Sequence, residues 1–346
     1  MEQRLTKLWY RDSPGPSLLQ PLSWLYEAAM RVRRGAYAHG WLATHGVGKP
    51  VVVVGNLTVG GTGKTPLVIW LARHLRERGL KVGIVSRGYG SDPKQPARLV
   101  DPGISRWQEV GDEPLLLARR SGCDTVVGRD RVAAARALVA RQVDVIVADD
   151  GLQHLRLARQ CEIVVVDGIR GFGNARVLPA GPLREPVARL AAADLIVING
   201  TPEHPSLSSA VKAKALQMTL QPEEALRVDG QGSSTALEAF RGRPIHAVAG
   251  IGNPARFFRD LRSRGLEVIE HPFPDHHPFI PRDLSFADDL PVLMTEKDAV
   301  KCGTFSDPRL WFVPTAAVFA AAQARELLEH VLRKISPLTS STEVGS

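Results

Sequence analysis

A lysine and a threonine that follow a glycine-rich segment have the residue types and spacing of a phosphate-binding loop. The segment consists of Thr58, Val59, Gly60, Gly61, Thr62, Gly63, Lys64 and Thr65. In such loops successive backbone N–H groups surround a phosphate, the lysine reaches the β- and γ-phosphates, and the threonine hydroxyl ligates Mg²⁺. The usual pattern begins with glycine where this chain has Thr58, but three glycines remain. We therefore predict a nucleotide-phosphate site rather than a glycine turn without a ligand.

Two adjacent aspartates end an apolar segment further along the chain. Residues 143–148 are mainly apolar and lead into Asp149 and Asp150. A buried strand that ends in aspartate holds Mg²⁺ in P-loop NTPases, directly or through water. Neighbouring side chains of an extended chain point to opposite sides, so we expect one of the two to face the metal first. The alternative is an Asp-Asp-Gly turn without a metal.

Two loops carry charged residues that have both a functional and a structural explanation. Asp112 precedes a helical pattern, where a carboxylate either caps the helix or acts as a base. Arg184 and Glu185 are flanked by prolines, which is consistent with an active-site loop or with a surface ion pair. Arg87, in a glycine loop after a strand, fits a phosphate contact or a surface turn equally well.

A third loop concentrates histidine and aspartate. His276 and His277 follow Asp275, a grouping that suits a general base or its orienting partner. A metal site is the alternative, but no matching cluster of ligands lies nearby in the sequence. The residue types alone do not decide which histidine faces a site.

The elements that position these residues follow a simple pattern. Apolar strand patterns alternate with helical patterns through the first part of the chain, which is typical of a parallel sheet covered on both faces. We predict an α/β fold: a P-loop NTPase-type parallel sheet with helices on both faces, a smaller C-terminal α/β domain and an N-terminal amphipathic helix. Ligands bind at the carboxyl ends of the strands in such sheets. The loop that ends in Lys64 and the pair Asp149 and Asp150 are both expected there.

Four regions are expected along the chain. Residues 1–45 form an N-terminal amphipathic segment, and residues 46–224 form the P-loop core. Residues 225–335 form the smaller α/β domain and end in a helix over 316–335. Residues 336–346 form a disordered tail. We place the joint between the two domains in the polar segment 202–234, which we expect to be irregular.

The N-terminal segment has one apolar helical face. Its members recur every three or four residues: Leu18, Leu22, Leu25, Ala29 and Val32. Aromatic residues and an arginine cluster accompany this face, as in helices that lie on a membrane surface. The plain alternative is a helix packed on the protein's own core with its arginines in solvent.

Composition narrows the classes of function. The chain has 346 residues and a net charge of +8, which suits nucleic acid, anionic lipid or a phosphorylated substrate. No nucleic-acid recognition motif accompanies the charge, so we expect no nucleic-acid partner. The three cysteines form no paired motif, which indicates a reduced compartment. An Asn-Lys-x-Asp guanine motif is missing from the segment 295–298, so GTP is not favoured.

Taken in order, the motifs resemble those of the lipid A disaccharide kinase (tetraacyldisaccharide 4'-kinase) family. The resemblance extends over roughly residues 10–330, and the full ordered set is specific although the P-loop alone is not. The matching segments are 59–66, 86–90 (Ser-Arg-Gly-Tyr-Gly), 111–114 (Gly-Asp-Glu-Pro), 149–154 (Asp-Asp-Gly-Leu-Gln-His), 182–186 (Pro-Leu-Arg-Glu-Pro), 250–254 (Gly-Ile-Gly-Asn-Pro), 274–277 (Pro-Asp-His-His) and 295–298 (Thr-Glu-Lys-Asp).

The resemblance implies ATP-dependent phosphorylation of the 4'-hydroxyl of a tetraacylated glucosamine disaccharide 1-phosphate, giving lipid IVA in lipid A biosynthesis. It implies ATP and Mg²⁺ as cofactors and an acylated disaccharide phosphate lipid as substrate. It also implies a peripheral protein on the cytoplasmic face of the Gram-negative inner membrane. With the resemblance, the membrane interpretation of residues 1–45 becomes the favoured one.

The family pattern also implies roles for individual residues. Asp112 accepts the proton of the sugar hydroxyl and forms a catalytic dyad with His276. Lys64 and the loop N–H groups neutralise the phosphates. Thr65 and Asp149, with Asp150 and Glu185, hold Mg²⁺ directly or through water. Arg184 and Arg87 stabilise charge on the transferring phosphoryl group.

A membrane-recruited P-loop switch or partition-type ATPase is the alternative function. Its P-loop and aspartate-tipped strand would look the same in the sequence. Such a protein hydrolyses ATP with water once its partner binds, whereas a kinase is nearly silent without its lipid acceptor.

Overall fold

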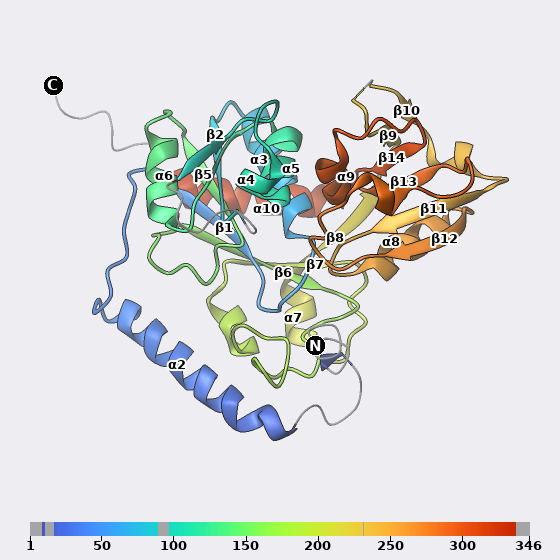
Figure 1. The fold of residues 1–346 in the computed structure, drawn as a ribbon. Coiled ribbons are helices and arrows are strands. Elements are labelled where there is room, and N and C mark those ends of the chain that lie inside the picture. Colours follow the sequence, from blue (N-terminus) through green and yellow to red (C-terminus); the bar gives the residue numbers. More distant parts are fainter. Residues whose placement is uncertain (1–8, 11–16, 89–96, 231, 337–346) are drawn as a thin grey trace.

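The computed structural model describes residues 9–10, 17–88, 97–230 and 232–336. Two sheets, each flanked by helices, lie side by side, and a long N-terminal helix lies along the body of the larger one (Figure 1). The expected tail at 336–346 falls outside the described residues except for Ser336. Tyr89 and Gly90, which end the loop after Arg87, also fall outside them.

The larger sheet has nine strands and carries the phosphate-binding loop. Across the sheet the strands are β15 (Thr315–Phe319), β8 (Ala215–Pro222), β7 (Leu195–Asn199), β6 (Cys161–Asp167), β1 (Val51–Gly55), β5 (Val145–Asp149), β2 (Val82–Ser86), β4 (Asp124–Val127) and β3 (Arg98–Val100). Neighbouring strands from β8 to β4 are parallel, and the edge strands β15 and β3 pair antiparallel. The predicted parallel sheet is confirmed.

Helices cover both faces of this sheet. They are α3 (Lys64–Glu77), α4 (Trp107–Val110), α5 (Asp112–Ser121), α6 (Arg131–Val139), α7 (Ser209–Lys214), α10 (Ala321–Ile335) and the 3₁₀ turn η2 (Val187–Ala192). Val52 and Val54 of β1 join a core with α3 and α10, while Val51 and Val53 join a second core with α6. Because both faces of β1 are buried, its sequence is a continuous apolar run rather than an alternating one.

The smaller sheet has six strands and forms the second domain. In sheet order these are β10 (Ser234–Thr235), β9 (Ala225–Arg227), β14 (Leu310–Val313), β13 (Val292–Thr295), β11 (Pro244–Ala249) and β12 (Glu267–Pro272). Its helices are α8 (Pro254–Ser263) and α9 (Glu296–Cys302), with 3₁₀ turns η3 (Leu237–Phe240) and η4 (Pro281–Leu284). Val300 of α9 packs in one apolar cluster with Leu115 and Leu116 of α5, so the two domains share a hydrophobic contact.

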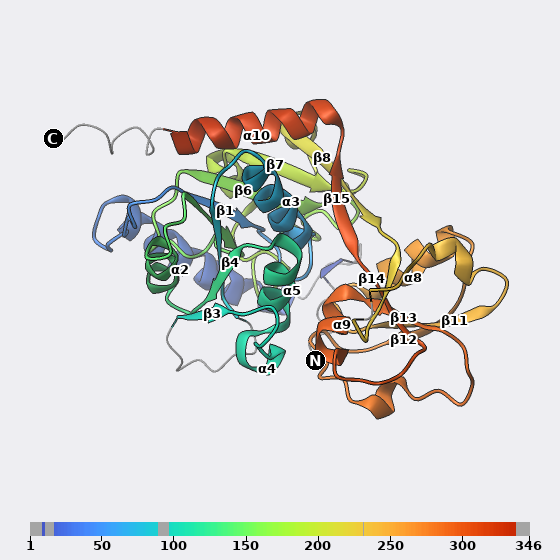
Figure 2. The ribbon, with the colours of Figure 1, turned by 90° about the horizontal axis from the view of Figure 1, so that it is seen from above.

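The end of the chain differs from the expected division at residues 225–335. β15 pairs antiparallel with β8 in the larger sheet, so the chain returns to the P-loop domain after β14. α10 then lies along this domain (Figure 2) and buries Leu327, Leu328 and Val331 in its core. The expected helix over 316–335 is therefore a strand followed by a helix that begins at Ala321.

The segment 202–234 is also more regular than expected. It contains α7 and the strands β8 and β9. In β8 only one side is well buried: Leu216 and Met218 are buried whereas Thr219 is exposed. The alternation of buried and exposed residues in β8 is short and follows polar residues. It therefore predicts a strand less strongly than the continuous apolar runs of the fully buried strands do.

The N-terminal helix α2 (Gln20–Ala38) follows the 3₁₀ turn η1 (Ser17–Leu19) and turns its apolar face outward. Leu18, Leu22, Leu25 and Val32 are 92%, 53%, 69% and 70% exposed. The opposite face contacts the protein: Ser23 is fully buried and donates to the carbonyl of Val177 at 2.9 Å, and Tyr26 packs against the hydrophobic core. The apolar face of the helix is therefore not packed on the protein's own core, as the plain alternative required, although the opposite face is. Among the described residues, none of the helices combines the length and apolarity needed to cross a membrane.

Candidate active site

The phosphate-binding loop connects β1 to α3 and requires glycine at its end. Gly63 has φ of +97° and a Cβ there would lie 2.6 Å from Nδ2 of Asn199, so no other residue fits. Asn199, at the end of β7, donates from Nδ2 to the carbonyl of Thr62 at 2.9 Å and so fixes the loop. Gly60 and Gly61 are exposed, which leaves this part of the loop open to a ligand.

Lys64 stands at the first position of α3 beside the predicted magnesium residues. Its Nζ lies 3.1 Å from Oδ1 of Asn56 and 3.5 Å from a carboxylate oxygen of Asp150. Arg184 Nη1 donates to both oxygens of Asp150 at 3.1 and 3.0 Å. Although burial raises the pKa of Asp150, the charges of Lys64 and Arg184 outweigh it and hold the pKa at about 2. The structure thus places Lys64, Asp150 and Arg184 in one charged cluster.

Asp149, the last residue of β5, is almost completely buried and faces different partners. Its Oδ2 accepts a hydrogen bond from the Ser86 hydroxyl at 3.2 Å, whereas its Oδ1 is buried without a partner among the described residues. Burial, together with the negative charge of Glu113, raises the pKa of Asp149 to about 7. A buried carboxylate oxygen without a hydrogen bond is costly unless something else binds it.

These residues fit a magnesium ion that is shared with a nucleotide. Within the described ranges, no group of three or more His, Cys, Asp or Glu side chains forms a complete metal site. Mg²⁺ bound with phosphates needs only one or two carboxylates, the rest of its shell being water and phosphate oxygens. The unpartnered oxygen of Asp149 would supply such a ligand. The other two residues expected to bind the ion are Asp150, the next residue of the chain, and Thr65, which follows Lys64.

The second domain contributes a histidine to the same side of the larger sheet. His276 Nδ1 lies 3.0 and 3.2 Å from the two carboxylate oxygens of Asp112, the first residue of α5. Asp112 is 4% exposed, and burial raises its pKa, but the hydrogen bond from His276 and the charges of Lys297 and Lys301 prevail and lower it to about 2. Burial lowers the pKa of His276, but the hydrogen bond to Asp112 outweighs it, so the net shift is upward. The structure therefore brings Asp112 and His276 together across the two domains.

Two lysines of α9 hold this pair in place. Lys297 Nζ lies 2.9 Å from Glu113 and 3.4 Å from His276 Nε2. The side chain of Lys301 is fully buried, 3.6 Å from Asp112 Oδ2 and 3.0 Å from Asp298 Oδ1. Because Glu113 also affects the pKa of Asp149, the dyad and the magnesium residues belong to one continuous electrostatic site.

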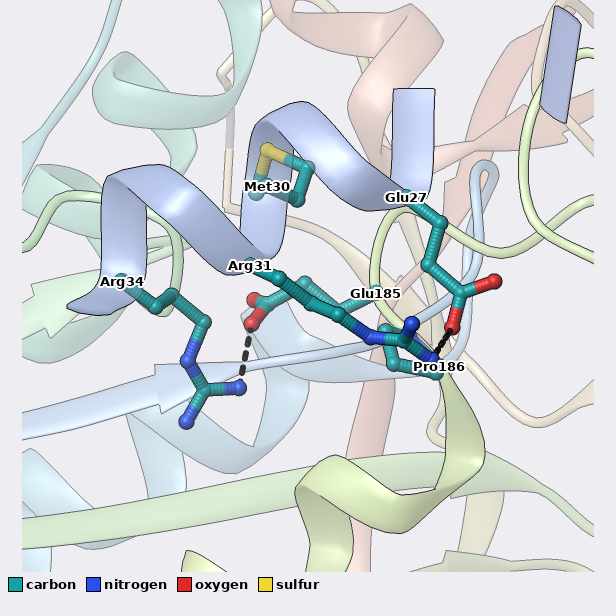
Figure 3. Close-up of a pocket in the computed structure, with 6 residues that line it drawn as sticks. All are labelled: Glu27, Met30, Arg31, Arg34, Glu185 and Pro186. Carbon is teal, nitrogen blue, oxygen red and sulfur yellow. Dashed lines mark hydrogen bonds and ion pairs between the residues drawn. The ribbon is translucent and has the colours of Figure 1, made fainter. Parts of the chain in front are cut away.

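Glu185 and Arg87 do not join this cluster directly. Glu185 is 2% exposed and its carboxylate contacts Arg34 of α2 at 3.1 Å, Arg189 at 3.5 Å and Gln153 at 3.0 Å. Figure 3 shows Glu185 and Arg34 facing one another beside α2, in a cavity of about 190 Å³. Its oxygens already have cationic and amide partners, as those of Asp150 do, and its role as a magnesium ligand stays a prediction. Arg87 is exposed at the end of β2, and its charge contributes to the lowered pKa of Arg131, for which burial is the main cause.

Several residues around the loop escaped the sequence analysis. Arg170 follows β6, donates to the carbonyl of Gly61 and pairs with Asp167 at 3.1 Å. Arg131, at the start of α6, donates to the backbone carbonyl of Asp149 at 3.1 Å, and burial lowers its pKa to about 10. Their position in the chain could have identified them as candidates for the site. Asn199, Arg170 and Arg131 all follow or end strands at the ligand-binding edge of the sheet.

Fold and site together define a P-loop α/β protein of the phosphotransferase type. Its phosphate-binding loop and aspartate-tipped strand lie beside a carboxylate–histidine pair that is suited to activating a hydroxyl. Comparison with known proteins gives the narrower class. A family model described as Tetraacyldisaccharide-1-P 4'-kinase matches residues 16–333.

Individual relatives agree with this match. A tetraacyldisaccharide 4'-kinase from Nitrosococcus oceani is 48% identical over 334 residues, which cover 95% of this chain and 96% of that relative. One from Alkalilimnicola ehrlichii is 48% identical over 338 residues, which cover 97% and 99%. A crystal structure of LpxK from Aquifex aeolicus in complex with ATP has a TM-score of 0.77 and 28% identity, covering 92% of this chain and 99% of that one.

The chain belongs to the tetraacyldisaccharide-1-P 4'-kinase family, and its function is that of an ATP-binding kinase of lipid A biosynthesis. The resemblance drawn from the motifs is thereby confirmed. The alternative of a switch or partition-type ATPase is not favoured.

Proposed function

We propose that this kinase transfers the γ-phosphoryl group of ATP to the 4'-hydroxyl of a tetraacylated glucosamine disaccharide 1-phosphate, with Asp112 as the base. The observation that carries the proposal is the hydrogen-bonded pair of Asp112 and His276, which come from different domains. A hydroxyl placed beside Asp112 would have an ionised carboxylate within reach, because the pKa of Asp112 is about 2.

Such a low pKa suits this reaction. In most analyses the transition state of phosphoryl transfer is loose, so positioning and charge stabilisation matter more than early proton removal. Asp112 takes the proton of the hydroxyl as the oxygen–phosphorus bond forms and the bond to the ADP oxygen breaks. His276 orients the carboxylate through Nδ1, and Lys297 contacts the other ring nitrogen of His276 at 3.4 Å.

The phosphates are neutralised by cations already grouped at the loop. Lys64 is placed to reach the β- and γ-phosphates, and Arg184, held by Asp150, lies next to it. Thr65, Asp149 and Asp150 would hold Mg²⁺, which supplies charge neutralisation across the β- and γ-phosphates when bound. Asp149 would serve as ligand through its unpartnered Oδ1. Because burial raises the pKa of Asp149 to about 7, metal binding and loss of its proton are coupled.

The proposed acceptor is a membrane lipid, and α2 has an exposed apolar face with which the protein can bind the membrane. Its exposed apolar face suits insertion into the headgroup boundary of a membrane, and Arg33 in its second half suits anionic lipids; the neighbouring Arg31 pairs with Glu27 at 2.6 Å. We propose that the protein binds peripherally to the cytoplasmic face of the Gram-negative inner membrane, where ATP and the lipid acceptor are both available.

The test is transfer of label to lipid. Purified protein is incubated with γ-labelled ATP, Mg²⁺ and detergent-dispersed tetraacylated disaccharide 1-phosphate, and the label is measured separately in lipid and in water. We expect label in the lipid, its loss in Lys64→Ala, and little release to water without the acceptor. Label released to water with none in the lipid would contradict the proposal and favour a switch-type ATPase.

A further inference from the structure

Three successive carbonyl oxygens of the phosphate-binding loop, those of residues 60–62, accept hydrogen bonds from side chains. Each donor comes from a different part of the P-loop domain, so the loop is held through its oxygens by the surrounding structure. The donors are Asn56 for the carbonyl of Gly60 at 3.3 Å, Arg170 for that of Gly61, and Asn199 for that of Thr62 at 2.9 Å.

These hydrogen bonds orient the N–H groups of the loop. In a planar trans peptide the carbonyl of one residue and the N–H of the next point in opposite directions. Because the carbonyls of residues 60–62 point towards their side-chain donors, the N–H groups of residues 61–63 point away from them. No residue in the described part of the chain accepts a hydrogen bond from these three N–H groups. They have the arrangement in which successive backbone N–H groups bind a phosphate.

Arg170 is the charged member of the three donors, and its guanidinium is held on two sides. Its Nε donates to Oδ2 of Asp167 at 3.1 Å, and its Cζ lies 5.6 Å from the centroid of the Tyr10 ring. A Cβ built on Gly60 would lie 3.7 Å from Nη1 of Arg170, so the same guanidinium reaches both exposed glycines of the loop. Asp167 and Tyr10 therefore fix the side chain that holds Gly61.

Tyr10 owes its position to the neighbouring Trp9, which is 7% exposed. Trp9 Nε1 donates to the carbonyl of Pro179 at 3.1 Å, and the carbonyl of Trp9 accepts from the N–H of Asn174 at 2.9 Å. Gly173 permits this close approach, since a Cβ there would lie 2.7 Å from the carbonyl oxygen of Trp9. Residues 9–10 thus pack on the loop that follows β6, although they precede residue 16, where the match to the family model begins.

We propose that Tyr10 is a positioning residue of the nucleotide site, which holds Arg170 on Gly61 and thereby keeps the N–H of Thr62 directed at the phosphates of ATP. The face of the aromatic ring attracts the guanidinium electrostatically and restricts its orientation. A loop that is fixed before its ligand arrives loses less conformational entropy on binding. The inference rests on the proposed use of this loop for the phosphates of ATP, and it adds residues 9–10 to that site.

The test measures the Kd for ATP with Mg²⁺ by isothermal titration calorimetry without lipid, so that the result does not depend on phosphoryl transfer. Tyr10→Ala should raise the Kd about 3- to 10-fold, and Tyr10→Phe should recover most of the loss because it keeps the ring. Arg170→Ala should raise the Kd by at least about 10-fold, because it removes a hydrogen bond from a charged donor. Since Tyr10 acts through Arg170, adding Tyr10→Ala to Arg170→Ala should cost little more.

Arg227→Ala is the matched control. Arg227 ends β9 in the smaller domain and has the same three kinds of partner as Arg170. Its Cζ lies 5.2 Å from the centroid of the Trp311 ring, it pairs with Asp229 at 2.6 Å, and it donates to the carbonyl of Pro308. Its replacement should leave the Kd for ATP at the wild-type value.

The inference is overturned if Tyr10→Ala keeps the wild-type Kd, if Tyr10→Phe binds ATP as weakly as Tyr10→Ala, or if the losses of Tyr10→Ala and Arg170→Ala add in full. An equal rise of the Kd in Arg227→Ala would also overturn it, because the effect would then be a general loss of stability. Should Arg170→Ala fail to fold, Tyr10→Ala and Tyr10→Phe decide the matter alone. The predicted changes in Kd, in a protein that phosphorylates no lipid, would support this inference and contradict the proposed function.

Discussion

Asp112 stays ionised although it is almost completely buried, because positive charge and a hydrogen bond surround it on the side of the second domain. Burial alone would favour the protonated acid. His276, Lys297 and Lys301 together reverse this and lower the pKa to about 2. The two lysines are themselves tied to Glu113 and Asp298, so the positive charge is held at fixed distances from the carboxylate.

The pKa of His276 depends on the negative charge of Asp112. In the wild type the pKa of His276 lies above 6.5, because the hydrogen bond from Nδ1 to Asp112 outweighs burial. In Asp112→Asn the negative charge is gone while burial and Lys297 remain, and both lower the pKa of His276. We expect an NMR titration of the His276 ring, assigned with His276→Gln, to move to lower pH in Asp112→Asn.

The raised pKa of His276 also makes the free energy of unfolding depend on pH. A histidine whose pKa is raised on folding stabilises the protein below its unfolded pKa, and this contribution is lost as the pH rises through the folded pKa. Asp112→Asn should therefore lose a stabilisation that the wild type has below about pH 6.5. An unchanged titration of His276 would mean that Asp112 and His276 do not interact in solution.

At the scale of elements, α2 is a helix with two dissimilar faces. Its inward face binds the loop that carries Arg184: Ser23 contacts Val177, and the Tyr26 hydroxyl donates to the carbonyl of Arg184 at 2.9 Å. Its apolar face is exposed. A helix that keeps its apolar side exposed has that side available for another apolar phase, and we propose that this phase is the membrane.

Changes on the exposed face should remove membrane binding without disturbing the fold. Each buried leucine contributes about 1.5–3 kcal/mol, so Leu22→Glu with Leu25→Glu should weaken binding to anionic vesicles by at least about 100-fold. Vesicle sedimentation measures the binding, and the Tm should not change because both side chains are exposed.

Ile104→Glu is the matched control for this pair. Ile104 is 81% exposed and lies between β3 and α4 rather than on α2, so its replacement should leave vesicle binding intact. Equal binding by the α2 variant and the wild type would remove the membrane role of this helix.

At the scale of the whole molecule, the site exists only where the two domains meet. Arg120 of α5 pairs with Glu296 of α9 at 2.9 Å and with Glu223, next to β8, at 2.6 Å. With the apolar contact of Val300, these ion pairs hold α5 and α9 together, and with them Asp112 and the loop of His276. The chain crosses between the domains twice, because β15 and α10 return to the P-loop domain.

How much of this arrangement the sequence predicts depends on whether the interacting residues are close together or far apart in the sequence. The P-loop, the strand that ends in Asp149 and the parallel sheet are predictable because each depends on a local run of residues. The return of β15 is not, since its partner β8 is distant in the sequence and both strands are only half buried. Asn199 belongs to no motif: its place at the end of a strand is the one local signal, and its contact with Thr62 depends on tertiary packing. Asp112 and His276 were identified by family resemblance, because residue types left each of them with a structural explanation as well.

The most direct test of a site shared by two domains is a double-mutant cycle on kcat for lipid phosphorylation, with Asp112→Asn, His276→Ala and the double variant. Removal of a general base typically costs about 10²–10⁴-fold, so we expect a loss of that size for Asp112→Asn while ATP still binds. If the pair acts as a unit, adding His276→Ala should cost little more. Wild-type kcat in Asp112→Asn, or fully additive losses in the double variant, would contradict the account.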